Sequence, residues 1–221
     1  MKHIIVDLEM NAIAKEHEEK GSTHKEIIEI GAVMLDEQYN EIDTFMTYVK
    51  PELNTEIESR YEALTGITTA MVREAPVFAE AIRMFADWCV SYDKEIILYQ
   101  WSENDRTQII SEMNIKKHTP TENEKLLTGT WIDFQKEFSR LLGLPKPVAL
   151  EKAVDYAGVA FEGRQHDALY DARNTASLFI MSRDEEQFKK EMKYMMEAIN
   201  SEKEETFLGE MIDFELLKEQ L

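Results

Sequence analysis

Acidic residues interrupt an apolar stretch near the start of the chain. The segment 4–10, Ile-Ile-Val-Asp-Leu-Glu-Met, is typical of a buried strand, in which side chains alternate between two faces. This alternation places Asp7 and Glu9 on the same face. Neighbouring carboxylates repel each other and are costly to bury, and bound divalent cations would remove both costs because hard cations bind carboxylate oxygens. A second interpretation is that the strand ends near Asp7 and that solvent surrounds both acids.

Asp105 is a third candidate for this chemistry. It belongs to an expected helix over 102–114 and lies four and eight residues before Ile109 and Met113, so it continues their apolar stripe. The carboxylate is therefore expected at the edge of the core. Taken alone, the residue has a simpler explanation, because an acid in the first turn of a helix interacts favourably with the helix dipole.

The segment 163–176 holds a fourth acid, Asp171, and a histidine, His166. Small and apolar residues form the core face of the expected helix: Ala168, Ala172, Thr175, Ala176, Phe179 and Ile180. Asp171 is drawn onto this face or its edge, so its carboxylate needs an arginine or a metal ion, and Arg173 points elsewhere. His166 precedes the helix and can reach over its N-terminus, although a lone histidine in a loop is commonly only solvated.

The four acids and the histidine together would suit hydrolysis of a phosphodiester. Four carboxylates balance two divalent cations, and two ions roughly 3.5–4 Å apart are the standard arrangement for in-line attack at phosphorus. A neutral imidazole, with an ordinary pKa of about 6.5, can accept the proton of the attacking water. This hypothesis requires the acids to converge in the fold, with His166 beside them.

The order of the other elements predicts a mixed α/β fold. Two strands over 26–36 and 40–50 form a hairpin, so at least one strand runs antiparallel to the first. A hairpin followed by alternating helices and strands favours a mixed sheet with helices on both faces. The later elements are a helix over 76–90, a strand over 95–99, a helix over 102–114, a polar loop over 116–128, an edge strand over 130–134 that runs into a helix to 142, and helices over 149–157 and 167–183.

The net charge of −19 argues against an ordinary nucleic-acid-binding surface. Proteins of that class are usually basic, because their affinity comes from neutralising phosphates. This chain would repel a polyanion at long range. It therefore binds either no nucleic acid or a short end, through metal ions and a local basic patch.

The composition also limits the compartment. The single cysteine, Cys89, excludes an intramolecular disulfide and lies in an apolar helical pattern typical of a buried, inert thiol. No apolar run approaches the length of a membrane span, and the N-terminus lacks the layout of a signal peptide. We expect a cytoplasmic protein.

Residues 184–221 differ from the rest of the chain, because they are rich in acids and carry two helical apolar stripes. The first stripe runs from Phe188 to Ile199 and the second from Phe207 to Leu217. A helical hairpin packed on the domain explains both stripes. A partner-binding or dimerising arm is the alternative, since faces rich in methionine adapt to partners.

The order Val6-Asp7-Leu8-Glu9, then Asp105, then His166-x4-Asp171 resembles that of the DEDDh 3′–5′ exonucleases, which have a ribonuclease-H-like fold. The resemblance is to the branch with the histone-mRNA and small-RNA exonucleases and bacterial KapD-like proteins. It covers about residues 1–183, which we expect to be the exonuclease domain, with 184–221 as a helical extension. Further matching segments are 26–33 (Glu-Ile-Ile-Glu-Ile-Gly-Ala-Val), 64–68 (Leu-Thr-Gly-Ile-Thr), 75–78 (Ala-Pro-Val-Phe), Gly163-Arg164-x-His166 and 171–174 (Asp-Ala-Arg-Asn).

The resemblance implies roles for individual residues. The four acids, Asp7, Glu9, Asp105 and Asp171, would hold two Mg²⁺ or Mn²⁺ ions, and His166 would be the general base. Met10, Leu64 and Thr65 would border the terminal nucleotide. The resemblance also implies a five-stranded sheet with one antiparallel strand and release of 5′-mononucleotides. The chain departs from the branch at Ser102, where glycine is usual, and after Glu9, where the familiar Thr-Cys-Trp-type loop is missing.

We therefore expect a metal-dependent 3′–5′ exonuclease that acts on the 3′ end of single-stranded nucleic acid, with RNA favoured over DNA. Two other functions remain open. One is a regulatory binding protein of the same fold that uses its acidic extension as the working surface. The other is a phosphodiesterase for a small nucleotide, a substrate compatible with an acidic surface.

Overall fold

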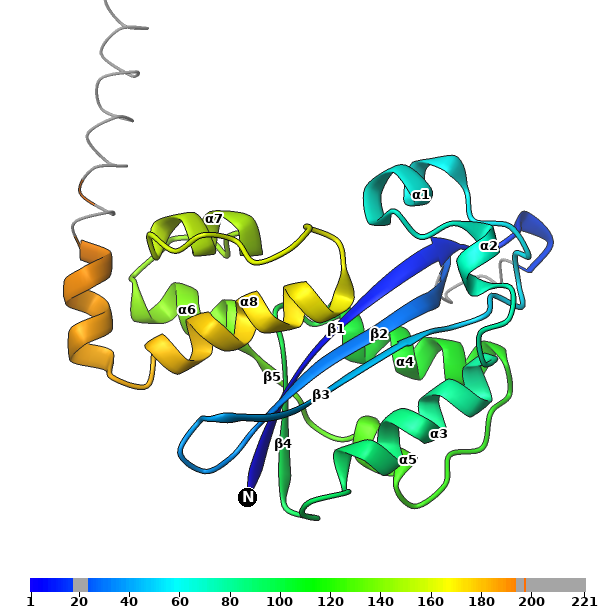
Figure 1. Cartoon of the computed structure of the whole chain (residues 1–221), viewed down its shortest axis with the longest axis horizontal. Helices are drawn as coiled ribbons and strands as arrows, with labels where there is room; N and C mark the ends of the chain where they lie inside the picture. Colours follow the sequence, from blue (N-terminus) through cyan, green and yellow to red (C-terminus); the bar gives the residue numbers. More distant parts are fainter. Residues whose placement is uncertain (18–23, 194–196, 198–221) are drawn as a thin grey trace, which may run out of the picture.

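The computed structural model describes residues 1–17, 24–193 and 197. Five strands form one sheet in the order β3-β2-β1-β4-β5 (Figure 1). β1 pairs antiparallel with β2 and parallel with β4, β2 pairs antiparallel with β3, and β4 pairs parallel with β5. Within this sheet β2 runs against the other strands, so the expected ribonuclease-H-like mixed sheet with one antiparallel strand is confirmed. The strands are β1 (Lys2–Ala12), β2 (Lys25–Leu35), β3 (Glu41–Tyr48), β4 (Ile96–Gln100) and β5 (Ile132–Asp133).

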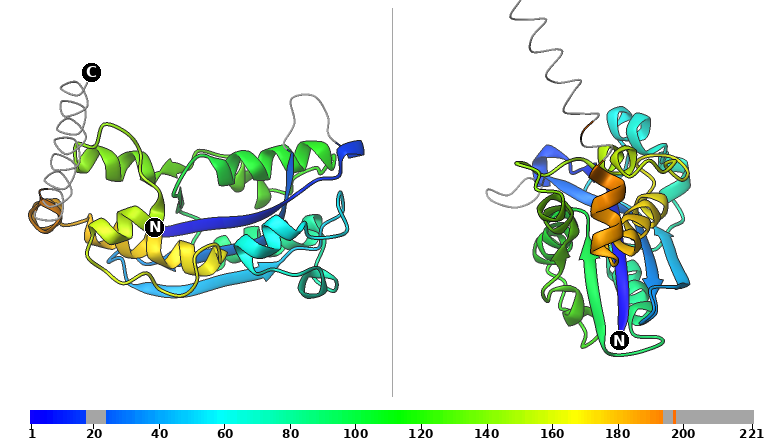
Figure 2. Two further views of the ribbon diagram at one scale, coloured as in Figure 1. Left: turned by 90° about the horizontal axis from the view of Figure 1, so that it is seen from above. Right: turned by 90° about the vertical axis from the view of Figure 1, so that its left-hand side faces the viewer.

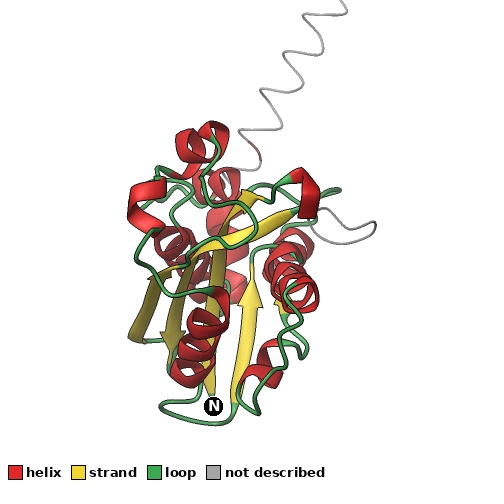
Figure 3. Cartoon of the chain, turned by 90° about the vertical axis from the view of Figure 1, so that its right-hand side faces the viewer, coloured by secondary structure: helices red, strands yellow, loops and turns green. Residues whose placement is uncertain are grey.

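Helices cover both faces of the sheet, as the sequence predicts (Figures 2 and 3). The core on one face joins α3, α4 and α5 to the sheet, and the core on the other face joins α6, α7 and α8 to it. The helices are η1 (Lys15–His17, a 3-10 turn), α1 (Ser59–Thr65), α2 (Thr69–Val72), α3 (Phe78–Cys89), α4 (Asn104–Ile115), α5 (Glu124–Leu127), α6 (Phe134–Leu141), α7 (Leu150–Tyr156) and α8 (Ala168–Met181).

β1 has the two faces that its alternating pattern predicts. Ile4, Val6 and Leu8 belong to the first core, whereas Ile5 belongs to the second. The face of Ile5 is also the face of the acidic residues, and it is covered by α8. The strand continues past the predicted end at Met10, with an irregularity in its pairing between Glu9 and Met10.

A glycine in β2 sets how closely α8 approaches the sheet. Gly31 lies opposite Asp7 in the antiparallel pair. A Cβ atom on Gly31 would lie 2.2 Å from the backbone carbonyl carbon of Ala168, the first residue of α8. The absence of a side chain therefore lets the first turn of α8, which carries Asp171, pack directly on β1 and β2.

The segment 116–128 differs from the sequence-based expectation, whereas the described part of the extension agrees with the expected helix packed on the domain. The segment 116–128, expected as a polar loop, contains the short helix α5, which the buried side chain of Leu127 holds against the first core. In the extension, residues 185–193 are helical, and the buried side chains of Phe188 and Met192 join the second core. The stripe from Phe207 to Leu217 lies outside the described residues.

Among the described residues, no helix is both long enough and apolar enough to cross a membrane.

Candidate active site

A cavity of about 700 Å³ opens where the ends of β1 and β4 meet the first turns of α4 and α8. All four acids singled out in the sequence and His166 line it, together with Met10 and Leu64. Thr65 is not among the lining residues. The fold therefore brings together groups that are separated by up to 164 positions in the chain, Asp7 and Asp171 being the extremes.

The carboxylates of the cavity are crowded and largely shielded from water. Glu9, Asp105 and Asp171 are buried and Asp7 is half-buried. Burial raises the pKa of Asp7 well above its usual range, and repulsion from Asp105 and Glu9 adds to the effect. Burial, with repulsion from Glu9, raises the pKa of Asp105 to about 8. The cluster therefore cannot be fully ionised at neutral pH without a compensating positive charge.

The pKa of Asp171 is also raised, and one of its carboxylate oxygens lacks a hydrogen-bond partner among the described residues. Burial raises its pKa to about 7, against a hydrogen bond from the His166 backbone that lowers it. That bond uses Oδ2, at 3.1 Å from the His166 nitrogen. The buried Oδ1 has no hydrogen-bond partner in the structure. A buried carboxylate oxygen without a donor is a vacant ligand atom.

The donor set matches a hard divalent cation. Glu9, His166 and Asp171 each offer a ligand atom, and these atoms lie within 4.8 Å of one another. The surrounding groups are carboxylates, the ligands that Mg²⁺ and Mn²⁺ prefer. Bound cations would give the unpaired oxygen of Asp171 a partner and would reduce the repulsion at Asp7 and Asp105, so the residues present fit divalent metal ions.

His166 lies at the rim of the cavity. Its side chain is 47% exposed, and Nδ1 is 3.7 Å from Glu9 Oε1. The contact with Glu9 is the main reason that the pKa of the imidazole is raised. Its backbone adopts a left-handed φ of 60°, which is uncommon outside glycine. The expectation of a neutral histidine therefore requires that cations neutralise Glu9.

A fifth acid, Glu29, belongs to the cluster and was not singled out from the sequence. It lies opposite Glu9 in the β1–β2 pair and is only 1% exposed. Its carboxylate accepts the backbone N–H of Ala168 at 3.0 Å, which holds the first turn of α8. Burial raises its pKa to about 7. Glu29 is an acid within the apolar strand expected over 26–36, and this pattern could have identified it as a candidate.

One wall of the cavity is α1. Leu64 is 45% exposed and lines the cavity, whereas Thr65 is buried. The Thr65 hydroxyl donates to the Tyr61 carbonyl at 2.9 Å and accepts the Ile67 N–H at 3.0 Å. Thr65 therefore shapes the end of α1, and Leu64 presents the apolar surface.

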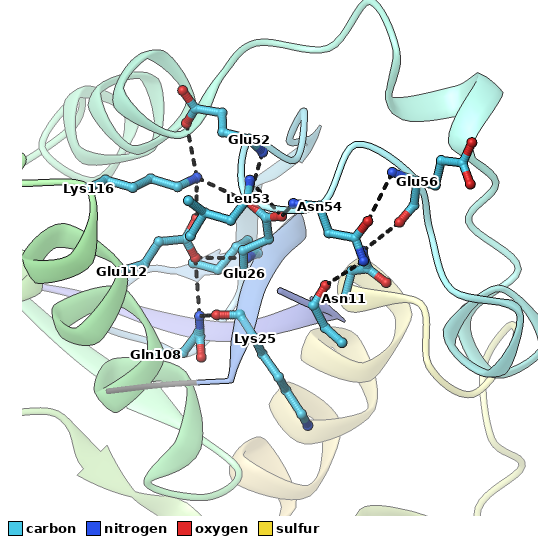
Figure 4. A network of polar contacts seen from close by, with 12 residues as sticks. Asn11, Lys25, Glu26, Glu52, Leu53, Asn54, Glu56, Gln108, Glu112 and Lys116 are labelled. Carbon is cyan, nitrogen blue, oxygen red and sulfur yellow. Dashed lines mark hydrogen bonds and ion pairs between the residues drawn. The ribbon is translucent and has the colours of Figure 1, made fainter. Parts of the chain in front are cut away.

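Buried polar contacts hold α4 against β2 and the segment 52–54 (Figure 4). The Glu26 carboxylate is fully buried and accepts the backbone N–H groups of residues 52–54. The Lys116 ammonium lies 3.4 Å from Glu26 Oε2 and 2.7 Å from Glu112 Oε1, and Glu112 Oε2 accepts the Ile27 N–H at 2.8 Å. This network fixes the direction of α4 and, with it, the acid in its first turn.

Comparisons with known proteins identify the family of the chain. A family model described as "Exonuclease" matches residues 4–179. Human "3′-5′ exoribonuclease 1" is 28% identical over 164 residues, covering 70% of this chain and 45% of that protein. "ERI1 exoribonuclease 2" of Danio rerio is 30% identical over 195 residues, covering 79% of this chain and 34% of that protein. The chain thus spans less than half the length of these relatives.

Solved structures share the fold. The nuclease domain of 3′hExo, a DEDDh family member bound to rAMP, superposes with a TM-score of 0.71 at 22% identity, covering 85% of this chain and 94% of that one. A full-length 3′-exonuclease superposes with a TM-score of 0.69 at 23% identity, covering 84% of this chain and 61% of that one.

Proposed function

Because the chain belongs to the exonuclease family, we propose that it is a metal-dependent 3′–5′ exonuclease that removes 5′-mononucleotides from the 3′ end of single-stranded nucleic acid. The observation that carries the proposal is the cluster of four carboxylates in one cavity, with a buried Asp171 oxygen that lacks any donor. RNA is favoured over DNA as the substrate, since the relatives are named exoribonucleases.

In the proposed mechanism, Asp7, Glu9, Asp105 and Asp171 would hold two divalent ions, Mg²⁺ or Mn²⁺. Such ions, when bound, supply the positive charge that polarises the scissile phosphate and acidifies the attacking water. His166 accepts the proton of that water at its imidazole. Neutralising Glu9 removes the field that raises the pKa of His166 and returns the imidazole toward its ordinary value, at which it is mostly an acceptor at neutral pH.

The wall formed by α1 would bind the terminal nucleoside. Leu64 offers exposed apolar surface for a base, and Met10 also lines the cavity. Thr65 would act by fixing the end of α1. No covalent nucleophile is needed, and Cys89 is unsuited to such a role because burial raises the pKa of its thiol far above its usual range.

Cleavage of 5′-labelled single-stranded RNA and DNA tests the proposal directly. With Mn²⁺ we expect a ladder of products that shorten from the 3′ end, and we expect EDTA to abolish it. Asp7→Ala serves as the inactive control, since it removes a carboxylate at the centre of the cluster. Absence of cleavage of either polymer in the presence of Mn²⁺ would contradict the proposal.

The acidic surface favours a second candidate, a phosphodiesterase for small nucleotides. The net charge of −19 disfavours a long polyanion but not a dinucleotide. Rates on a dinucleotide and on an RNA of about ten times that length separate the candidates. Hydrolysis of the dinucleotide alone would support the small-substrate enzyme.

The extension after residue 183 is proposed as the site of a protein partner or of homodimerisation. Its first part packs on the domain through Phe188 and Met192. Light scattering of the full chain tests for the dimer.

A further inference from the structure

The loop that carries His166 is held at both ends. At its start, the Asn174 side chain receives the Glu162 N–H at 2.9 Å and donates to the Glu162 carbonyl at 2.9 Å. At its end, the His166 N–H binds Asp171. The residues between are exposed, and Gly163 and His166 both have positive φ values, of 71° and 60°. A loop of this kind needs a further contact if the imidazole is to stay in one place.

Arg164 supplies such a contact, which joins the loop to the end of α1. Its Nη2 donates to the carbonyl of Ala63 at 3.2 Å and to that of Leu64 at 3.1 Å. Both carbonyls belong to the last turn of α1, where backbone acceptors lack helical partners and the helix dipole favours a cation. A planar guanidinium with several donors suits two neighbouring carbonyls better than an ammonium does.

The end of α1 is shaped to receive this guanidinium. Gly66 follows the helix in the left-handed conformation, with φ of 73°. A Cβ atom on Gly66 would lie 1.6 Å from Arg164 Nη1. Two features of this position therefore favour glycine: the left-handed backbone conformation and the space that the Arg164 guanidinium occupies.

We propose that Arg164 is a positioning residue that latches the His166 loop to α1, so that the wall facing the terminal nucleoside and the general base move as one unit. The inference rests on the proposed exonuclease function, and it assigns to Arg164 a role that acts through His166. A nucleoside seated against Leu64 would then hold the imidazole over the attacking water.

The test compares Arg164→Ala with the wild-type chain in steady-state hydrolysis of single-stranded RNA with Mn²⁺. We expect kcat to fall by about 10²-fold, the loss typical of a misplacement of about 1 Å at a reacting group. KM and the affinity for Mn²⁺ stay near their wild-type values, because the substitution removes neither an acid of the cavity nor the apolar side chain of Leu64. Arg83→Ala, which removes an exposed arginine of α3 that lies outside the cavity lining, is the control for loss of charge.

Added guanidinium ion should restore part of the lost kcat of Arg164→Ala, since it can occupy the vacated seat. It should fail in the double variant with Gly66→Ala, in which the new methyl group fills that seat. Amide hydrogen exchange over residues 163–167 should rise in Arg164→Ala, a readout that does not depend on activity.

Three results would overturn the latch: an unchanged kcat, a raised KM with kcat intact, or a loss of kcat that guanidinium does not relieve. Each can occur with an active wild-type enzyme, so each rejects the latch and leaves the exonuclease proposal standing. An inactive wild-type chain would reject both.

Discussion

His166 is the residue whose role is most open to test. Its distance to Glu9 and its place within 4.8 Å of two potential metal ligands allow it to act either as a base or as a ligand. We predict that His166→Ala lowers kcat on the order of 10²–10⁴-fold, the usual contribution of a general base. Titration with Mn²⁺, followed by calorimetry, should show nearly unchanged affinity.

A different result would reassign the residue. If His166→Ala loses Mn²⁺ affinity along with activity, the imidazole is a ligand and the proton acceptor lies elsewhere. His166→Gln is the matched control, because an amide retains a hydrogen-bonding group at the rim of the cavity but cannot act as a base near neutral pH.

At the same scale, the sequence predicted which acids converge in one cavity but not all of their neighbours. Asp7 and Glu9 stood out because charge within an apolar strand is costly, and the structure places both in the cavity. Glu29 has the same property, but its position opposite Glu9 depends on strand register. Strand register and contacts between residues far apart in the sequence, such as that of Arg164 with α1, depend on the tertiary structure. Local sequence patterns therefore do not predict them.

At the scale of elements, the fit between α8 and the sheet depends on Gly31. We predict that Gly31→Val lowers the free energy of unfolding by about 1–3 kcal/mol, the usual cost of overpacking a core. Because the new side chain meets the backbone of Ala168, the first turn of α8 must move and Asp171 with it. The melting temperature, measured by thermal unfolding, and kcat should therefore both decrease.

Gly129→Ala provides the comparison for this prediction. A Cβ atom there would meet the Leu126 carbonyl group, with the oxygen at 3.1 Å and the carbon at 4.0 Å, and Gly129 does not line the cavity. A small change in melting temperature and an unchanged kcat are expected. Equal loss of activity in both glycine variants would mean that the approach of α8 does not control the site.

The extension offers a second prediction at this scale. Phe188 is buried and packs edge-on against Phe138 of α6, with ring centroids 5.7 Å apart. Phe188→Ala should lower stability by about 3–5 kcal/mol, as expected for a buried phenylalanine, while kcat at low temperature stays near the wild-type value. Chemical denaturation measures the first and RNA hydrolysis the second. A negligible change in stability would support a domain boundary at residue 183.

The order and type of the elements could be predicted from sequence because their apolar periods were regular. The spacing of apolar residues in the sequence correctly predicted the two faces of β1 and the helix α3. The helix α5 could not be predicted in this way, since it has only four residues and is stabilised by burial of Leu127 in tertiary packing. Thr65 is expected beside the nucleotide, and its hydroxyl is hydrogen-bonded to the backbone of Tyr61 and Ile67. The sequence pattern alone does not show these two contacts.

At the scale of the whole molecule, the acids of the cavity make stability depend on pH and metal together. The folded-state pKa of Asp105 is about 8 and that of Asp171 about 7, both far above the values of an unfolded chain. Between pH 4 and 8 the folded protein therefore retains protons that the unfolded chain has released. Without metal, stability must fall as pH rises through this window.

Divalent cations should reverse this dependence, because they bind the ionised carboxylates of the folded state alone. We predict that the melting temperature in EDTA decreases from about pH 5 to pH 8, whereas the increase produced by Mn²⁺ grows over the same range. Asp105→Asn should flatten the slope in EDTA, because it removes one raised pKa from the cluster, and should also reduce the Mn²⁺ effect. Differential scanning calorimetry at fixed ionic strength measures both. A melting temperature in EDTA that rises toward pH 8 would show that the four carboxylates are not held together against their repulsion, and the metal site would have to be abandoned.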